Sequence, residues 1–504
     1  MPHFSALLID ISAKQRYIFG SNRLKLNIGA SHIMAYMIFG DTLKAALPAL
    51  DLKKWKEDLI LLPTEDAPVA VGYIGGGNAL LLFQDKGAIK GFIKAYSQRL
   101  LKEYPGLNPT FAVSDSYDPG NLKPAKEALN KSLNFNKSLH YTLTTPFKHG
   151  IEADCPLTGG AQEVYNELEK AWVSNEADIK IKNCGYSQTQ LRDELLGDPL
   201  NPYFDFSEEL EDLCPESEKR YVAAVHIDGN GMGQMFLDIN TLAKLREQSV
   251  KVSEKLKASM KKLTDYVITN IDVNTKAVFE EVPLTHKNGK WILPFRPIIN
   301  AGDDITFVCH GQLGIHLAEK YMEILSDAAV GGLSIASCAG VAVFHTKYPF
   351  SRMYHLSEEL AGSAKKKVRG FTGACSIEFL ISSNGYMGDL EKLKADKSNQ
   401  LRGPYQVGIG PFTNENGEAL KLTNFDNLKA QLKDFYGFTD RERKAWPKNK
   451  IAEMRELLFQ SEAQQQVFEQ HLLMRGTVDQ RGIFQKYSYD AIEMTDFYPK
   501  SLLK

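Results

Sequence analysis

Three aspartates, Asp228, Asp303 and Asp304, could together support metal-dependent chemistry. Asp228 ends the apolar run YVAAVHID at 221–228, and Asp303 and Asp304 lie in the turn AGDD at 301–304, between two further apolar runs. Converging carboxylates repel one another unless a cation is bound. Hard oxygen ligands favour Mg²⁺ or Mn²⁺, which keep waters and recruit substrate phosphates. We therefore predict that all three are catalytic and metal-binding; the alternative for the Asp pair is a polar turn.

A glycine-rich turn, DGNGMG at 228–233, directly follows the first of these runs. If it opens a helix, its backbone N–H groups could hold a triphosphate. The predicted nucleotide-binding residues here are Asn230, Gly231, Met232, Gly233 and, in the acidic turn, Gly302. The alternative is a flexible turn with a helix cap. The pattern is not the dinucleotide fingerprint GxGxxG.

A basic run, SAKKKVR at 363–369, lies in a segment with helical spacing. A lysine on the inner face of that helix could reach the β- and γ-phosphates of a nucleotide. The alternative is a solvated charge run, which is the usual meaning of such a sequence.

The elements that must position these residues occur twice along the chain. Apolar runs and helical patterns follow the order β-α-β-β-α-β from about residue 4 to 114, and again from about 220 to 344. This is the split-βαβ or ferredoxin-like arrangement, whose first strand is central and pairs with the hairpin. The copies align Asp10 with Asp228, Gly77 with Asp303, and Asn78 with Asp304. The three carboxylates should therefore meet at one end of the second sheet.

The predicted fold class is α+β, with two ferredoxin-like domains in tandem, a mixed region between them and a helical C-terminal domain. The expected boundaries are 1–114, 115–218, 219–385 and 386–504. The first copy is degenerate, because its hairpin turn reads GGGN at 75–78 and both carboxylates are missing.

The first copy should not support two-metal chemistry, but it could still hold a nucleotide. The candidate residues are Gly76 and Gly77 in the turn, and Gly29 and Ser31 on the first helical segment. Close helix packing is the alternative for Gly29 and Ser31. For Asp10, a strand-end residue that caps the following turn is the favoured alternative.

Composition excludes several classes of protein. The chain has 504 residues with 60 Lys+Arg and 62 Asp+Glu, a net charge of −2, which argues against non-specific nucleic-acid binding. Its apolar runs are shorter than the roughly 18 residues that a membrane span needs. The N-terminus does not resemble a signal peptide. The six cysteines are scattered, with no CxxC pair, so a cytoplasmic location is expected.

A strand ending in Asp, a hairpin with GDD and a helix containing Ala-Lys together resemble the palm domains of the GGDEF cyclase, nucleotidyl cyclase and polymerase superfamily. Two palms, the first degenerate, are similar to the large polymerase-like subunit of type III CRISPR effector complexes. RLKLNIGASHI (23–33), the segment 339–367 and QLRGPYQV (400–407) are also similar to that family.

The resemblance implies that the second palm binds ATP or another nucleoside triphosphate, with Mg²⁺ (or Mn²⁺) as cofactor and Lys365 on the triphosphate. A second nucleotide would lie across the interface between the palms. The product would be a cyclic oligonucleotide that serves as an antiviral second messenger. Other CRISPR effector subunits and guide or target RNA are the implied partners, and no membrane is.

Several positions depart from the family pattern. The usual N-terminal HD nuclease domain is not found, and no His-Asp dipeptide occurs, so a compact member without single-stranded DNase activity is expected. Ala301 replaces the first glycine of GGDD, and Asn230 replaces a second acidic residue. CPLTG at 155–159 resembles a remnant of a zinc-binding insertion, with one cysteine left. Two other functions remain open: a non-catalytic nucleotide-binding scaffold of an RNA-guided complex, and a stand-alone cyclic dinucleotide synthase.

Overall fold

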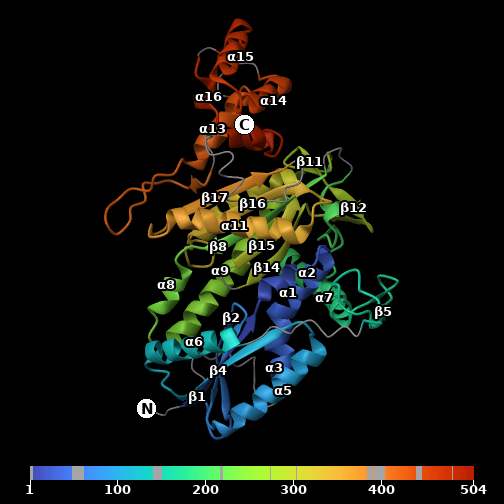
Figure 1. Cartoon of the computed structure of the whole chain (residues 1–504), viewed down its shortest axis with the longest axis vertical. Helices are drawn as coiled ribbons and strands as arrows, with labels where there is room; N and C mark the ends of the chain where they lie inside the picture. Colours follow the sequence, from blue (N-terminus) through green and yellow to red (C-terminus); the bar gives the residue numbers. More distant parts are fainter. Residues whose placement is uncertain are drawn as a thin grey trace.

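The computed structural model describes residues 4–47, 62–139, 150–215, 220–272, 274–301, 304–382, 390, 403–438, 445–478 and 481–504. Along the long axis of the molecule lie a first sheet near the N-terminus, a larger second sheet, and a group of C-terminal helices (Figure 1). The mixed α+β class predicted from the sequence is confirmed.

The first sheet has the strand order β2-β3-β1-β4, so the first strand along the chain is central. Its strands are β1 (Phe4–Ser12), β2 (Val69–Gly75), β3 (Asn78–Phe83) and β4 (Asn108–Tyr117). Successive side chains of a strand point to opposite faces, and both faces of β1 are buried. Leu7 packs with helix α5 (Gly87–Glu103) on one face. Leu8 packs with α6 (Leu122–Leu139) on the other.

The helical segment that follows β1 is divided in the structure. The described part contains α1 (Lys14–Phe19), α2 (Leu24–His32), a π-helical stretch (Ile33–Asp41) and α3 (Thr42–Ala46). α1 ends at Phe19, and after Gly20 two side chains form hydrogen bonds with the backbone in place of helical backbone bonds. The hydroxyl of Ser21 accepts from the N–H of Arg23, and the amide of Asn27 donates to the carbonyl of Ser21. Such local bonds compete with helix formation.

The second sheet repeats this order and adds two strands, giving β14-β15-β8-β16-β17-β18. The strands are β8 (Tyr221–Gly229), β14 (Phe295–Ala301), β15 (Asp304–His310), β16 (Ser337–His345), β17 (Cys375–Ile381) and β18 (Tyr405–Val407). Strand β17 is not at the edge of the sheet, because β18 pairs with it. The sheet thus continues into the segment that the sequence assigned to the helical domain.

Helices cover both faces of the second sheet. They are α8 (Met232–Leu237), α9 (Leu242–Thr269), α10 (Gly314–Ser326) and α11 (Phe350–Val368). α9 and α10 share a core with Ala223 and Val225 of β8. α11 shares a core with Val222 and Ala224 on the opposite face.

Between the two sheets the chain forms small elements packed around one helix. They are β5 (Val164–Asn166), β6 (Ala171–Val173), α7 (Asn175–Leu191), a π-helical turn (Arg192–Leu196), β7 (Phe204–Asp205) and a 3₁₀ turn (Leu210–Leu213). Short strands that follow α9 complete two small sheets: β9 (Ile271–Asp272), β10 (Ala277–Val278), β11 (Val282–Pro283), β12 (Thr285–Lys287) and β13 (Lys290–Ile292). Cys155 is buried and free, as are the other five cysteines.

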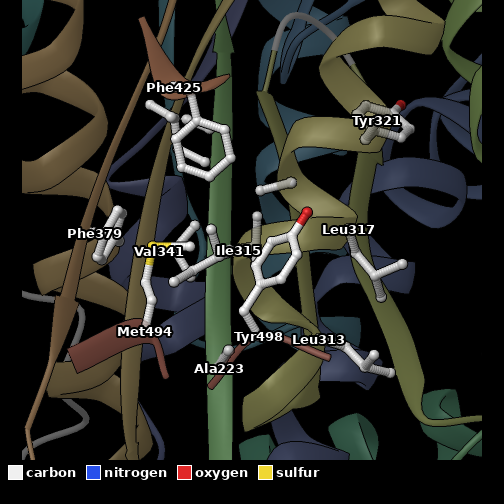
Figure 2. Close-up of a cluster of buried hydrophobic side chains, with 14 of the residues drawn as sticks. Ala223, Leu313, Ile315, Leu317, Tyr321, Val341, Phe379, Phe425, Met494 and Tyr498 are labelled. Atoms are coloured by element: carbon white, nitrogen blue, oxygen red, sulfur yellow. The ribbon is translucent and has the colours of Figure 1, made fainter. Parts of the chain in front are cut away.

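The C-terminal helices pack on the α10 side of the second sheet. They are α13 (Phe425–Phe435), α14 (Lys448–Leu457), α15 (Glu462–Met474), α16 (Ile483–Lys486), α17 (Tyr489–Met494) and a 3₁₀ turn (Lys500–Leu503). Figure 2 shows Phe425, Met494 and Tyr498 gathered with Ile315 of α10 and Val341 of β16 in one apolar cluster. Within the described ranges no helix is both long and apolar enough to cross a bilayer.

The units built on the two sheets share a continuous core. One buried cluster contains side chains of β1, α1, α2 and α5 together with side chains of β8, β14, β16 and α11. The ring of Phe19, at the end of α1, stacks on Tyr354 of α11 with centroids 3.5 Å apart. Such packing fixes the position of one unit against the other.

Candidate active site

The strand ends of the second sheet bring two of the predicted acidic residues together. Asp228 on β8 and Asp304 on β15 are direct cross-strand partners in the antiparallel ladder. Directly opposite residues have Cβ atoms about 4.5–5.5 Å apart. Both side chains are partly exposed, Asp228 at 23% and Asp304 at 21%. The expected juxtaposition of these two carboxylates is therefore present.

The alternation of the strands determines which way this pair faces. Ile227 and Ile305, the neighbours of the two aspartates, are buried in the core shared with α9 and α10. Because side chains alternate, the aspartates belong to the opposite face, on which Ala224 packs towards α11 and the first unit. The carboxylates thus lie on the side of the sheet where the two units meet.

The acidic pair fits a magnesium ion, although a third ligand is not described. Asp303 and Gly302 lie outside the described residues. Within the described ranges no group of three His, Cys, Asp or Glu side chains could hold a metal. Mg²⁺ is commonly bound by one or two carboxylates plus waters and substrate phosphates. Two partly exposed carboxylates that each already attract an ammonium group meet that requirement.

Lys365 is placed beside the first aspartate. Its Nζ lies 2.5 Å from Oδ2 of Asp228 and donates to the carbonyl of Gly229 at 3.0 Å. The helix that carries it, α11, runs unusually close to β16 at Gly340, where an added Cβ would stand 2.0 Å from the carbonyl oxygen of Ser357. The absence of a side chain at Gly340 is what allows this approach. Of the two interpretations of the basic run, the inward-facing lysine holds for Lys365.

The two adjacent lysines belong to a solvated charge run, which was the alternative interpretation of this sequence. Lys366 and Lys367 are exposed, while Ala364 and Val368 are buried against Cys338. Cys338 is the partner of Asp228 on β16. Burial raises the pKa of its thiol to about 11, so it stays protonated at neutral pH and is a poor metal ligand.

The glycine-rich turn is held to the sheet by its backbone and by Asn230. The side-chain amide of Asn230 donates to the carbonyl of Ala374, and the backbone N–H of Asn230 donates to the carbonyl of Ala336. Gly231 has a φ of 77°, which favours glycine. Met232 is buried and lines a small apolar cavity with Gly229. Gly233 has open space around its Cα.

The helix that follows this turn is short. α8 ends at Leu237, and the next helix, α9, begins at Leu242. Thr241 caps the second helix, with its side chain accepting from the N–H of Lys244. Because the dipole effect grows from aligned peptides, a six-residue helix contributes little to phosphate binding.

The first unit repeats the geometry with one carboxylate. Asp10 on β1 pairs across the ladder with Asn78 on β3, as Asp228 does with Asp304. The carboxylate of Asp10 lies 2.5 Å from Nζ of Lys137 on α6. Lys137 and Lys365 each lie fifteen residues after the first residue of their helix. Each unit therefore places one lysine against its strand-end aspartate.

The turn of the first unit has the conformation that its glycines allow. Gly76 and Gly77 have φ values of 60° and 83°, and the carbonyl of Gly77 accepts from the N–H of Ile11. The carbonyl of Gly76 accepts from Nζ of Lys14 at 3.0 Å.

Gly29 and Ser31 serve the packing of α2, which was the alternative to nucleotide contact. At Gly29 an added Cβ would stand 1.7 Å from the carbonyl oxygen of Lys180 on α7, so the two helices touch there. Ser31 is buried, and its hydroxyl donates to the carbonyl of Ile298 on β14 at 2.5 Å. Both residues thus have packing roles, and their contact with nucleotide stays a prediction.

Sequence reasoning missed three residues of this region: Lys14, Lys137 and Gly340. Glycine inside the apolar run CAGVAVF was a signal of close backbone approach at Gly340. Aligning the helices that follow the fourth strand of each copy would have matched Lys137 with Lys365. No sequence signal indicates Lys14, because its contact joins different units.

No family model matches the sequence, and no curated protein matches it. Solved structures do share its fold. A Csm1 structure from T. onnurineus has a TM-score of 0.52 at 15% identity, covering 99% of this chain and 69% of that one. A Csm1–Csm4 cassette in complex with cA4 has a TM-score of 0.51 at 15% identity, covering 99% and 70%. A cassette in complex with pppApA has a TM-score of 0.52 at 13% identity, covering 99% and 69%.

These structures contain Csm1 subunits of type III CRISPR Csm complexes. The resemblance predicted from the sequence is thereby confirmed at the level of the fold, over nearly the whole chain.

Proposed function

We propose that the chain is a nucleotidyltransferase that joins and cyclises nucleoside triphosphates, ATP foremost, into cyclic oligonucleotides in CRISPR-type antiviral defence. In this proposal the two units are ferredoxin-like palm domains, and the second one carries the active centre. Asp228, Asp303 and Asp304 hold Mg²⁺ or Mn²⁺, and Lys365 binds the triphosphate.

One observation carries the proposal: Asp228 and Asp304 stand opposite each other at the strand ends, with an ammonium group against each. A carboxylate pair of this kind is costly to keep on an exposed strand end unless a cation or a phosphate-bound metal uses it. The fold shared with Csm1 supports the same reaction class, since Csm1–Csm4 cassettes have been solved in complex with cA4 and with pppApA.

The reaction requires little covalent participation by the protein. The 3′-hydroxyl of one nucleotide attacks the α-phosphorus of another, forming a P–O bond as the bond to pyrophosphate breaks. The hydroxyl proton passes to solvent. When bound, divalent ions supply charge neutralisation at the phosphates and lower the pKa of the attacking hydroxyl. The chain itself contributes position and charge: Lys365 leaves Asp228 to bind the triphosphate as negative charge develops on the pyrophosphate.

The first unit would hold the nucleotide that supplies the hydroxyl. It has one strand-end carboxylate, Asp10, already paired with Lys137, and a neutral turn at Gly76 and Gly77. In such a site the ammonium group of Lys137 could bind phosphate, and the backbone of the turn could approach the ligand closely. The site has too few carboxylates to hold two metal ions. We therefore propose that the first unit binds a nucleotide and the second carries out the chemistry.

The proposed partners follow from the same comparison. Csm1–Csm4 cassettes are assemblies of two subunits, and we expect this chain to bind an equivalent subunit. Guide or target RNA is proposed as the activator.

A reaction with all four triphosphates tests the proposal. Protein, Mg²⁺ and an equimolar mixture are incubated with and without added RNA, and products are identified by mass. We expect linear intermediates such as pppApA and a cyclic product, both lost when EDTA is added. Nucleotide binding with no product under any condition would favour the scaffold function. A product of two nucleotides only would favour a stand-alone dinucleotide synthase.

A further inference from the structure

Lys14 reaches from the first unit into the acidic site of the second. Its Nζ lies 3.8 Å from Oδ2 of Asp304 and donates to the carbonyl of Gly76 at 3.0 Å. The Lys14 side chain is 31% exposed and that of Asp304 is 21% exposed. One ammonium group therefore touches both hairpin turns, the neutral turn of the first unit and the acidic turn of the second.

The surrounding structure determines where this lysine points. Ala13, directly before it, has a φ of 55° and a ψ of 35°, a left-handed conformation that costs a residue with a Cβ about 1 kcal/mol. Lys14 lies four positions after Asp10 and opens α1, as Met232 lies four positions after Asp228 and opens α8. Phe19, at the other end of the same helix, is stacked on Tyr354.

We propose that Lys14 is a resident counter-cation of Asp304, which neutralises this carboxylate in the nucleotide-free protein and which an incoming divalent ion must displace. The inference rests on the proposed function, because it takes Asp304 to be a metal-binding residue. Lys14 acts on the metal through Asp304, and it is therefore a positioning residue.

The same contact links metal binding to the first unit. When Nζ of Lys14 leaves Asp304, it can keep its hydrogen bond to the Gly76 carbonyl. It then stays beside the turn that we assign to the second nucleotide. An ammonium group there can meet the phosphates of that nucleotide once a metal ion holds Asp304. Lys14 would then favour metal and nucleotide binding together over metal binding alone.

The test measures Mn²⁺ affinity of the nucleotide-free protein by electron paramagnetic resonance. Lys14→Met keeps the length of the side chain but removes the charge, so the repulsion between Mn²⁺ and the ammonium disappears. We expect Mn²⁺ to bind this variant about tenfold more tightly than the parent, most clearly at low salt. Lys14→Arg should bind Mn²⁺ as the parent does. Arg16→Met, at an exposed position of the same helix, controls for net charge and should also match the parent.

The outcomes separate this inference from the proposed function. If Mn²⁺ binds the parent and this binding is lost in Asp304→Asn, but Lys14→Met binds no more tightly, the counter-cation role is wrong and the metal site stands. If Arg16→Met gains as much affinity as Lys14→Met, the effect is one of net charge and the role is again wrong. If Mn²⁺ binding is insensitive to Asp304→Asn, both the inference and the metal site are wrong.

Discussion

Asp228→Asn is expected to lower the rate of pyrophosphate release from ATP by about a thousandfold or more, while the protein stays folded. The substitution keeps the shape of the side chain but removes its charge and one strong oxygen ligand. Loss of about 4 kcal/mol of transition-state stabilisation corresponds to that factor. The same size of effect is expected for Asp303→Asn, since its carboxylate belongs to the same predicted trio. Pyrophosphate release with Mg²⁺ and ATP measures both.

The matched comparison for this prediction lies in the first unit. Asp10→Asn changes the equivalent strand-end residue, paired with Lys137 rather than with a second carboxylate. Because that unit has no acidic turn, we expect a higher KM for the second nucleotide and a much smaller fall in kcat. Parent-like pyrophosphate release by purified, folded Asp303→Asn or Asp228→Asn would refute the assignment of the active centre.

Lys365→Met is expected to lower kcat/KM for ATP by about 10- to 100-fold. A charge-assisted contact to phosphate contributes about 1.5–3 kcal/mol, and methionine cannot supply it. Nζ of Lys365 lies 2.5 Å from Oδ2 of Asp228. A triphosphate bound by the acidic residues would therefore lie within its reach. Steady-state kinetics at saturating Mg²⁺ give the value.

Two neighbouring residues provide controls on the same helix. Lys366→Met and Lys367→Met remove one charge each from exposed positions, and both should keep kcat/KM within about twofold, as is usual for surface substitutions. Three variants with equal losses would show that the basic run acts only through its overall charge, and the specific role of Lys365 would be abandoned.

The pairing of Asp228 with Asp304 could be predicted because strand register leaves little freedom. A two-residue periodicity and a glycine-containing turn fix which residues oppose each other when one face is buried. The internal repeat then placed Asp10 and Asn78 in the matching positions, as the ladder shows. Asp303 remains a sequence prediction, since it lies outside the described residues.

Residues at contacts between distant elements could not be predicted in the same way. Gly29 was a candidate for nucleotide binding, yet it lies where α2 crosses α7, close to the carbonyl of Lys180. Lys14 belongs to a polar segment, and it meets Asp304 where the first unit packs on the second, as Phe19 does on Tyr354. Contacts between units depend on how separate surfaces fit together, and a single sequence carries no periodic signal for that.

The most direct test of the central claim is to locate Mn²⁺ by anomalous scattering in crystals of the protein with Mn²⁺ and a non-hydrolysable ATP analogue. We predict a peak at about 2.1 Å from a carboxylate oxygen of both Asp228 and Asp304, with Nζ of Lys365 moved from Asp228 to the triphosphate. A well-ordered nucleotide whose metal lies away from both aspartates, while Lys365 remains on Asp228, would contradict the account.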